Sequence, residues 1–429
     1  MRIENATLAD GRVVDVRVED GEIAAVGDVD AVEGETVIDA DGNLLLPGAI
    51  DVHVHFREPG FEHKETWATG SKSAAAGGVT TVVDQPNTTP TTTTGEGFDA
   101  KAERAETSII DYGINGGVTP DWNPESLFER PLFALGEVFL ADSTGDMGIE
   151  ADLFADAAAR AADAGIPVTV HAEDADLFDE SAIEGGLGGV GRDADADSWS
   201  AYRSAEAEAV AVERAARVGA EAGAQIHIAH TSTPEGVDAA RDGDATCEVT
   251  PHHLFLSRDD LSELGTYGRM NPPLRSEARR EAMFERLADG RIDMVATDHA
   301  PHTVEEKEQS LLDAPSGVPG VETMVPLLLG AAVDDKLSLE RVRDVVATNP
   351  ADVFDLPKKG KIEAGADADF ALYDLDAPRE IRGDDLHSKC EWTPFEGFSG
   401  VFPEWTMVRG EMVWDGEEFG DVAGENVRK

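Results

Sequence analysis

Hydrophobic and polar positions follow one pattern at the two ends of the chain and another in the middle. Residues 1–46 contain short alternating runs such as "RVVDVRVED" and "GETVIDADGNLLL", separated by Gly and Asp turns. Such alternation is typical of small antiparallel strands. The end of the chain repeats it in "DADFALYDLD" and "SGVFPEWTMVRGEMVWDGEEF". We therefore expect residues 1–47 and 356–429 to form one small β-sandwich domain.

The middle of the chain, residues 48–355, alternates short apolar runs with Ala- and Glu-rich helical stretches. Strands are predicted over residues 48–55, 79–86, 108–115, 132–140, 166–172, 225–230, 244–250 and 292–300. Eight strands alternating with helices predict an α/β fold, a (β/α)8 TIM barrel that forms the catalytic domain. An open doubly wound sheet is the alternative. It is disfavoured because no GxGxxG motif or P-loop follows any strand.

The balance of acidic and basic residues indicates the solution conditions to which the protein is adapted. The chain has 87 acidic and 35 basic residues, a formal net charge of −52, and only ten of the basic residues are lysine. Nucleic acid and anionic membranes would repel such a surface. The acidic residues are scattered through apolar-periodic segments and do not form one tail. We therefore expect a folded protein adapted to concentrated salt, which screens its self-repulsion.

The sequence lacks the patterns typical of a disulfide framework, a signal peptide or a membrane-spanning helix. Cys247 and Cys390 cannot form a disulfide framework or a Cys-rich zinc site. The start, "MRIENATLAD", lacks the basic and apolar regions of a signal peptide. The longest apolar run, at 324–333, is too short for a bilayer span. We expect a soluble, cytoplasmic protein with no membrane or nucleic-acid partner.

Candidate metal ligands stand at the ends of several predicted strands. In "DVHVHFREPG", His53, His55 and Arg57 alternate along a strand and so face the same side. Two imidazoles aimed inward suit Zn²⁺, although a hydrogen-bonded core pair would give the same pattern. Other predicted strands end in His171, His230 and Asp298. Because barrel strands present their carboxyl ends at one mouth, these residues together predict a metal site there.

Longer motifs carry a family resemblance that covers nearly the whole chain. The stretches "DVHVHFREPGFEHKETWATGSKSAAAGGVTTVVDQPNTTP", "RMNPPLR", "ATDHAPHTVEEK" and "GKIEAGADADFALYDLD" resemble the amidohydrolase superfamily, and within it the dihydroorotases. The acidic composition indicates a halophilic, archaeal member. Two details separate the related families. Allantoinases have a Leu-Asn variant of "QPNTTP", and dihydropyrimidinases lack an arginine after the histidine pair.

The resemblance implies two Zn²⁺ per subunit. His53 and His55 would bind one ion, His171 and His230 the other, and Asp298 would touch the first. The family often bridges its metals with a carboxylated lysine, but this chain has no lysine between Lys101 and Lys307. Glu137 stands at the aligned position and would take that role. The alternatives are Asp142 and, less favoured, Asp146.

The resemblance also implies a reaction. Two metal ions lower the pKa of bound water from ~15.7 to about 7, so that hydroxide attacks a cyclic amide carbonyl. Asp298, as general acid and base, would pass the proton to the leaving ring nitrogen. In reverse, N-carbamoyl-L-aspartate closes to L-dihydroorotate with loss of water, a step of de novo pyrimidine biosynthesis. The substrate would be a small molecule, and barrels of this kind often pair as homodimers.

The substrate carries a carboxylate, for which Arg57 offers a fork of donors. The resemblance assigns substrate contacts to His55, Arg57, Asn87, Asn271, His302 and the backbone near Ser316 and Gly317. Related enzymes often have a larger apolar residue at position 316. Residues 303–317 form either a cover that excludes water or an exposed acidic loop.

Two other functions stay open on the sequence alone. One is a related cyclic amidase, either an allantoinase or a hydantoinase (dihydropyrimidinase). Arg57 and Asn87 argue against it, because both presuppose a substrate carboxylate. The other is a noncatalytic scaffold homologue, which the complete set of ligand-type residues disfavours.

Overall fold

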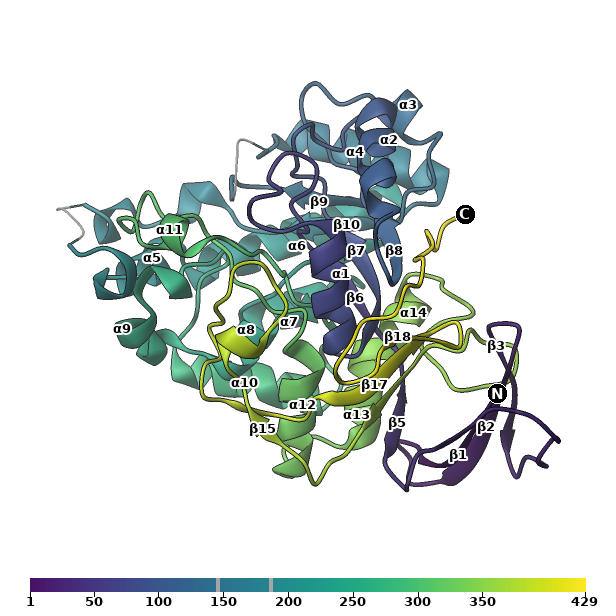
Figure 1. Ribbon diagram of the computed structural model, residues 1–429. Coiled ribbons are helices and arrows are strands. Elements are labelled where there is room, and N and C mark those ends of the chain that lie inside the picture. Colours follow the sequence, from purple (N-terminus) through teal and green to yellow (C-terminus); the bar gives the residue numbers. More distant parts are fainter. Residues whose placement is uncertain (144–146, 185–187) are drawn as a thin grey trace.

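The computed structural model describes residues 1–143, 147–184 and 188–429. Within them a ring of parallel strands forms the centre of the molecule (Figure 1). Its strands are β6 (Ala49–Val54), β7 (Val79–Asp84), β8 (Asp111–Ile114), β9 (Leu135–Phe139), β10 (Val168–His171), β11 (Ile226–Ile228), β12 (Thr246–Val249) and β13 (Met294–Val295). These strands lie at the eight positions predicted from the sequence.

Two ladders and two bridges connect the ring. Strands β6, β7 and β8 form one parallel ladder, and β9 to β13 form the other. Parallel bridges Gly116↔Leu135 and Val54↔His299 join the ladders at both seams. The ring is therefore continuous, as in the α/β barrel predicted from the sequence, and the open sheet is excluded.

Helices pack around the ring. The longer ones are α1 (Trp67–Ala76), α2 (Gly95–Ala105), α4 (Ala151–Ala164), α6 (Ala205–Ala222), α7 (Pro234–Asp242), α10 (Glu277–Ala288) and α12 (Met324–Val333). Helix α6 shows why they form where they do. Ser204 caps its first turn by accepting a hydrogen bond from the Ala207 N–H, and Gly223 ends it at a φ of 71°. Its small residues, including Ala211 and Ala215, are buried towards the strands.

Shorter helices lie in the connections. They are α3 (Pro124–Leu127), α5 (Asp197–Tyr202), α8 (Pro251–Phe255), α9 (Leu261–Leu264), α11 (Val304–Lys307), α13 (Leu339–Arg343) and α14 (Asn349–Val353). Several of them, including α5, α9 and α11, lie together on one side of the molecule (Figure 1). Within the described residues no helix combines the length and apolarity needed to cross a membrane.

Strands from both ends of the chain share one sheet. Its order is β18-β17-β14-β5-β1-β2-β3, with β4 paired to β1. The members are β1 (Arg2–Thr7), β2 (Val13–Glu19), β3 (Glu22–Gly27), β4 (Val37–Asp39), β5 (Leu44–Pro47), β14 (Phe370–Tyr373), β17 (Pro403–Val408) and β18 (Glu411–Trp414). The antiparallel pair β5–β14, with Leu45 opposite Leu372, joins the two ends. The predicted pairing of the chain ends is thus present. Strands β15 (Arg379–Glu380) and β16 (Ser399–Gly400) form a separate pair.

A group of charges, buried at Asp111, Lys359 and Asp369 and half-buried at Asp367 and Arg409, lies where this sheet meets the ring. Lys359 Nζ is 2.6 Å from Asp111 Oδ2, 2.6 Å from Asp369 Oδ2 and 3.1 Å from Asp367 Oδ2. The guanidinium of Arg409 also pairs with Asp111. We call these five residues the junction cluster. They tie β8 of the ring to the C-terminal part of the chain.

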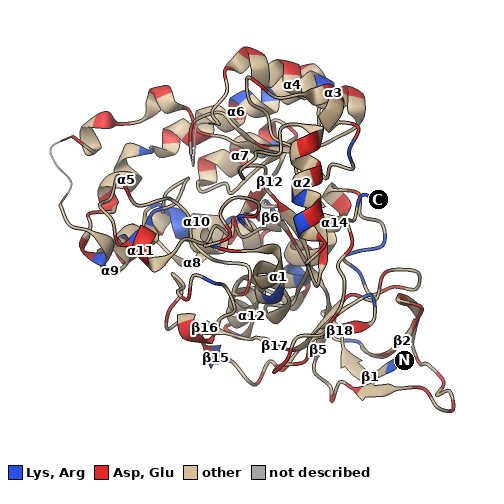
Figure 2. Ribbon diagram, turned by 45° about the horizontal axis from the view of Figure 1, so that its top comes forward, with Lys and Arg blue, Asp and Glu red and all other residues tan. Residues whose placement is uncertain are grey.

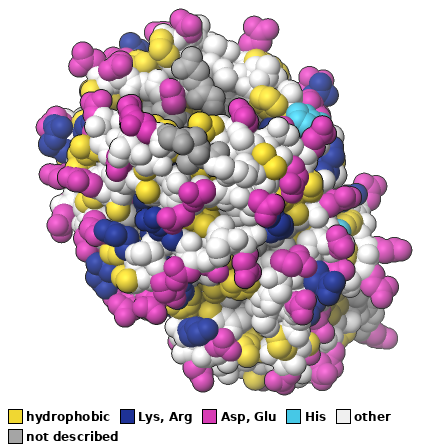
Figure 3. Space-filling view, turned by 90° about the vertical axis from the view of Figure 1, so that its left-hand side faces the viewer, with side chains coloured by type: hydrophobic (Ala, Val, Ile, Leu, Met, Phe, Trp, Pro, Cys, Tyr) yellow, Lys and Arg dark blue, Asp and Glu magenta, His cyan; other side chains and the backbone are white. Residues whose placement is uncertain are grey.

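Acidic residues of the described chain are spread over the exterior in the views of Figures 2 and 3. Figure 2 shows Asp and Glu along outer helices such as α2 and α11. On the face that carries α5, α9 and α11, acidic side chains surround smaller groups of Lys and Arg (Figure 3). The acidity therefore belongs to a folded surface, as the sequence predicted.

Candidate active site

Six buried histidines and carboxylates meet at the carboxyl ends of the ring strands. They are His53, His55, Glu137, His171, His230 and Asp298, and we call them the mouth cluster. Ligand-type atoms of His53, His55 and Asp298 lie within 4.8 Å of one another, and so do those of His53, Glu137 and His230. His53 is common to both groups. Side chains from distant parts of the sequence thus converge as the strand-end argument predicted.

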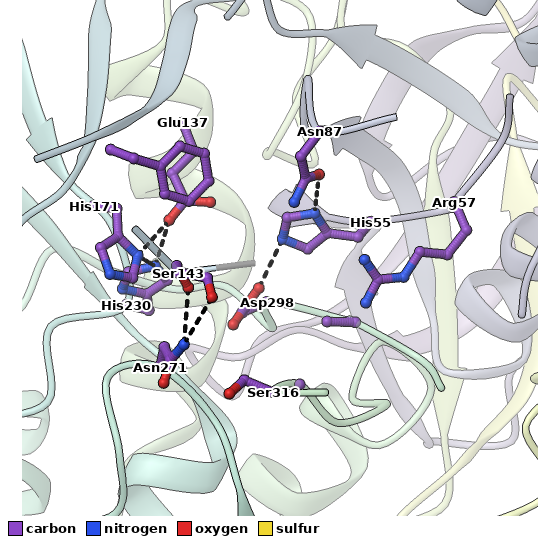
Figure 4. A pocket seen from close by; sticks show the side chains of 13 residues that line it. His55, Arg57, Asn87, Glu137, Ser143, His171, His230, Asn271, Asp298 and Ser316 are labelled. Atoms are coloured by element: carbon purple, nitrogen blue, oxygen red, sulfur yellow. Dashed lines mark hydrogen bonds and ion pairs between the residues drawn. The ribbon is translucent and has the colours of Figure 1, made fainter. Parts of the chain in front are cut away.

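The first half of the mouth cluster is built around Asp298. His55 Nε2 lies 2.9 Å from Asp298 Oδ1, and His53 Nε2 lies 3.6 Å from the same oxygen. The other ring nitrogen of His55, Nδ1, is 2.7 Å from Asn87 Oδ1 (Figure 4). Since an amide oxygen only accepts, Nδ1 of His55 donates to it, and Nε2 is the ring nitrogen that faces Asp298 and the site.

The second half is built around Glu137. Its Oε1 is 2.9 Å from His171 Nδ1 and 2.6 Å from His230 Nε2, and its Oε2 is 3.4 Å from His53 Nε2. The two oxygens of one carboxylate therefore face histidines of both halves. Gln85, in the "QPNTTP" stretch, orients this residue by accepting a hydrogen bond from the Glu137 backbone N–H at 2.9 Å.

The alternative bridging residues differ in position. Asp142 is exposed, and its Oδ1 accepts a hydrogen bond of 2.6 Å from the Gly148 backbone N–H. It does not line the cavity of the mouth cluster. Asp146 lies outside the described residues. Of the two carboxylates that are described, only Glu137 lies among the histidines.

The chemistry of the mouth cluster suits divalent cations. Nε2 of His53 is buried and has no hydrogen-bond partner among the described residues, although it faces both carboxylates. Imidazole nitrogens and carboxylate oxygens in a buried group are typical zinc ligands. No Lys or Arg of the described chain forms an ion pair with Glu137 or Asp298 at 4.0 Å or less. The residues present therefore fit a metal centre.

Electrostatics favour positive charge in the mouth cluster. Burial alone would raise the pKa of Glu137, but His230 and His53 hold it well below its ordinary value. Burial would lower the pKa of His171, yet Glu137 and Glu173 raise it to about 9. The pKa of Asp298 is also lowered, because His55 and His53 outweigh its burial. The carboxylates that stabilise protonated imidazoles here would stabilise a metal cation in the same way.

Three site residues have an unusual backbone conformation. The φ angles of Arg57, His230 and Asp298 are 66°, 34° and 48°, in the left-handed region that non-glycine residues rarely adopt. Such conformations cost about 1–3 kcal/mol each and persist only where the surrounding structure holds them. Each of these conformations directs a side chain at the end of a ring strand towards the other site residues. The strained backbone therefore helps to bring the site together.

A carboxylate missed by the sequence analysis supports both halves of the mouth cluster. Oε1 of Glu248, on β12, lies 2.7 Å from His53 Nδ1 and accepts a 3.0 Å hydrogen bond from the His230 backbone N–H. Its Oε2 is 3.1 Å from His227 Nε2. The ionised carboxylate accepts a hydrogen bond from the Nδ1–H of His53 and so leaves Nε2 free to bind a metal. A lone glutamate inside the apolar run "DATCEVT" was the available sequence signal.

A small cavity opens beside the mouth cluster. Among the residues that line it are His55, Arg57, Asn87, Asn271, Ser316 and Gly317, all expected to contact substrate. Phe139, Ser143 and Ala300 also line it and were not expected. Ser143 Oγ accepts a 3.1 Å hydrogen bond from Asn271 Nδ2 (Figure 4). Ser143 follows strand β9, but a single serine in a loop gave no signal.

His302 is placed differently from the other expected substrate residues. It does not line the described cavity but lies behind Arg57, with Nε2 3.0 Å from Arg57 Nη2. The segment 303–317 that follows is held to the neighbouring loop. Lys307 is buried and donates hydrogen bonds to the carbonyls of Thr266 at 3.1 Å and Pro315 at 2.9 Å. Within the segment Lys307, Leu311 and Ala314 are buried, whereas residues 304–305, 308–309 and 312–313 are exposed, so it is an anchored loop with an exposed outer face.

Arg57 is a buried cation without a buried anion to match it. Its side chain makes no ion pair with any described carboxylate at 4.0 Å or less, and its Nε donates to the Pro301 carbonyl at 3.2 Å. Burial lowers its pKa to about 10, so the guanidinium stays charged at neutral pH. A buried charge left unpaired is costly. The cavity therefore favours an anionic group next to the mouth cluster.

Known proteins resemble the chain over its full length. Residues 44–413 match the model of the Amidohydrolase family. A dihydroorotase of Halobacterium salinarum is 67% identical over 429 residues, which cover 100% of this chain and 99% of the relative. A dihydroorotase of Methanosarcina mazei is 45% identical over 93% of this chain and 90% of its own.

Solved structures share the fold. The L-hydantoinase (dihydropyrimidinase) from Arthrobacter aurescens superimposes with a TM-score of 0.92 at 30% identity, covering 99% of this chain and 98% of the other. The dihydropyrimidinase from Brevibacillus agri does so with a TM-score of 0.90 at 28% identity, over 100% and 98%. Identity is thus much higher to the dihydroorotases than to the ring amidases of known structure.

Proposed function

The chain belongs to the amidohydrolase family, and we propose that within it this protein is a dihydroorotase, a hydrolase of a cyclic amide. It interconverts N-carbamoyl-L-aspartate and L-dihydroorotate, with water released on ring closure. The observation that carries this assignment is the buried, unpaired Arg57 at the edge of the mouth cluster. Arg57 offers a carboxylate-binding cation, and the substrate of a dihydroorotase carries a carboxylate for it to bind.

The hydantoinase alternative rests on the shared fold. The hydantoinases and dihydropyrimidinases that share the fold are 26–30% identical in sequence to this chain. The Halobacterium salinarum dihydroorotase is 67% identical to it. A hydantoin or dihydropyrimidine ring carries no carboxylate for Arg57 to bind. The cation therefore argues for the dihydroorotase reaction.

Enzymes of this family depend on metal ions, and the mouth cluster supplies ligands for them. We propose two Zn²⁺ per subunit, with His53, His55 and Asp298 holding one and His171 and His230 holding the other. Glu137 would bridge them, because its two oxygens face both halves. When bound, the ions would lower the pKa of water to about 7 and polarise the amide carbonyl.

Asp298 is the proposed general acid and base. Its carboxylate lines the cavity, and His55 and His53 keep its pKa low, so it is ionised and ready to accept a proton. In hydrolysis it would take a proton from the attacking water and deliver it to the ring nitrogen that leaves. In the synthetic direction the same oxygen would remove the proton of the attacking carbamoyl nitrogen.

Polar groups on the cavity wall would orient the substrate. Arg57 and Asn87 would bind its carboxylate, and Asn271 the amide edge of the ring. Asn271 is held for this by Trp199, whose Nε1–H donates to Asn271 Oδ1 at 2.9 Å. Ser316 and Gly317 line the same cavity, and their backbone groups would complete the pocket. His302 would act at the same carboxylate, through Arg57 or directly.

The wider setting follows from the reaction. We propose that the enzyme serves de novo pyrimidine biosynthesis in a salt-rich cytoplasm, and that it pairs as a homodimer. We also propose the domain bounds 1–47, 48–355 and 356–429, with the first and last forming a β-sandwich domain. The β5–β14 pairing supports the union of the two ends.

The reaction can be tested directly. Purified protein in multimolar KCl should form dihydroorotate from N-carbamoyl-L-aspartate, with allantoin and hydantoin as control substrates. Metal analysis should find zinc in protein never exposed to chelator. Turnover of hydantoin in place of dihydroorotate would assign the protein to the alternative, and metal-free active protein would contradict the metal centre.

A further inference from the structure

We propose that Lys64 is a positioning residue for substrate recognition, because it fixes which ring nitrogen of His302 carries the proton. That choice leaves Arg57 available to the substrate carboxylate. The proposal rests on the proposed function, since it concerns the same carboxylate. Lys64 itself does not line the described cavity. It acts from behind the wall that His302 and Arg57 form.

His302 is held on all its polar sides. Nδ1 is 3.1 Å from Lys64 Nζ, while Nε2 is 2.9 Å from the Ser316 carbonyl oxygen and 3.0 Å from Arg57 Nη2. Trp392 Nε1–H donates to the His302 carbonyl at 2.8 Å and fixes the backbone. The ring is almost fully buried, and burial, together with Arg57, keeps its pKa well below the ordinary value. It is therefore neutral and has one proton to place.

The neighbours decide between the two tautomers. With the proton on Nε2, the ring donates to the Ser316 carbonyl, and Nδ1 accepts from the Lys64 ammonium. With the proton on Nδ1, that N–H would face the ammonium at 3.1 Å, donor against donor, and the Ser316 carbonyl would lose its partner. An ammonium group donates and never accepts. The Nε2-protonated ring leaves only the Arg57 Nη2–H, at 3.0 Å, without an acceptor, whereas the Nδ1-protonated ring leaves both the Lys64 ammonium and the Ser316 carbonyl without a partner there. A charged Lys64 therefore favours the Nε2-protonated ring.

Glu306 pairs with Lys64 and favours its charged form, and it does not compete for the ring. Its Oε1 lies 3.0 Å from Lys64 Nζ, whereas its Oε2 lies 3.6 Å from His302 Nδ1, too far for a hydrogen bond. Burial and Arg57 lower the pKa of Lys64, and Glu306 opposes them. The lysine therefore has a carboxylate on one side and the ring nitrogen on the other.

The selected tautomer determines what Arg57 can bind. If Nε2 were unprotonated, it would accept a hydrogen bond from Arg57 Nη2 and occupy that donor. With Nε2 protonated, Nη2 meets an N–H and has no acceptor there until an anion enters the cavity. Lys64 in this way keeps a donor of Arg57 unsatisfied, and the substrate carboxylate supplies the missing acceptor.

The wild-type protein gives the first test. ¹⁵N-labelled histidine allows protonated and unprotonated ring nitrogens to be distinguished by NMR, and the signals of His302 are identified by their loss in His302→Gln. We expect a protonated Nε2 and an unprotonated Nδ1. A protonated Nδ1 would overturn the proposal whatever the activity. An Nε2-protonated ring in protein that does not turn over N-carbamoyl-L-aspartate would overturn the proposed function instead.

Variants give the second test. Lys64→Met should shift the His302 proton towards Nδ1 and raise KM for N-carbamoyl-L-aspartate about tenfold, with kcat within about twofold. Lys64→Arg keeps a donor and should retain the wild-type tautomer and most of the affinity. Lys72→Met makes the same change in a lysine that packs over Phe419, and should alter neither. An unchanged tautomer and KM in Lys64→Met would contradict the assignment.

Discussion

The mouth cluster and the junction cluster gather the same kind of ligand atoms and neutralise them differently. In the junction cluster, Asp111, Asp367 and Asp369 bring carboxylate oxygens within 4.8 Å of one another, as the mouth cluster does with its own ligand atoms. There the Lys359 ammonium lies among them. In the mouth cluster imidazoles take that place, and one buried nitrogen of His53 has no described partner.

The two clusters differ in whether their positive charge can be exchanged. The Lys359 ammonium is a fixed part of the chain, whereas an imidazole can exchange its proton for a metal ion. Burial would lower the pKa of Lys359, but Asp369 and Asp111 raise it above the ordinary value, so this charge is permanent. An imidazole can instead give up its proton and offer a lone pair to a metal. In this chain, therefore, the junction carboxylates are already neutralised by Lys359, whereas those of the mouth cluster face only imidazoles.

Substitutions in the two clusters should differ most in their effect on catalysis. Asp298→Asn should lower kcat/KM roughly a thousandfold, because it removes the group that carries the proton while preserving its shape. Asp367→Asn in the junction cluster should leave kcat/KM within about twofold, since the two sites are independent. Steady-state rates in KCl, with thermal melts to confirm folding, measure both. Comparable losses in the two variants would contradict the division between the clusters.

Removing the fixed cation should affect stability instead. Lys359→Met removes the cation that neutralises buried Asp369 and leaves Asp111 with Arg409 alone, and we expect a loss of about 3–5 kcal/mol in the free energy of unfolding. Urea titration in constant KCl gives this value. The zinc content of the folded variant should equal that of the wild type. A fall in zinc content would mean that the junction cluster contributes to metal binding.

A smaller effect is expected at Glu248, which contacts the proposed metal ligands but is not one of them. Glu248→Gln weakens the hold on His53 and on the His230 backbone, and should reduce zinc affinity about 10–100-fold. Competition with a chromophoric chelator measures the change. Glu322→Gln alters another buried glutamate outside both clusters and serves as the control. Equal affinities in the two variants would remove Glu248 from the metal centre.

The smallest effect should come from the rejected bridging residue. Asp142→Ala changes an exposed carboxylate that bonds only locally, so zinc content should stay at the wild-type level. Glu137→Ala removes the carboxylate that faces both halves and should release metal. Elemental analysis of both proteins decides the bridge. Metal loss in Asp142→Ala alone would reverse the assignment.

Much of the site could be predicted because short-range rules determine it. The alternation of His53, His55 and Arg57 along one strand fixes their common direction, and strand ends in a parallel ring meet at one mouth. Strand length was less predictable. The run 292–300 forms β13 over Met294–Val295 only, because the chain turns at Asp298, where φ is 48°. A site residue interrupts the regular pattern there.

Partners that act across long sequence separations could not be predicted. Nothing in the run containing Glu248 indicates that it meets His53, and nothing near Lys359 indicates that it lies between Asp111 and Asp369. The same holds for His302, for which the family resemblance implied direct substrate contact. Its position behind Arg57 depends on how residues 64, 302 and 316 pack together, and local patterns carry no information about that packing.

The pairing of β5 with β14 has a consequence for synthesis on the ribosome. Residues 44–47 leave the exit tunnel early, but the strand that hydrogen-bonds to them, residues 370–373, is translated only near the end. During elongation the peptide groups on this edge of β5 lack the hydrogen-bond partners that β14 will supply. Exposed strand edges of this kind are bound by chaperones and can start aggregation. A ribosomal pause late in the message would prolong that vulnerable interval, whereas a pause inside the first strands would not.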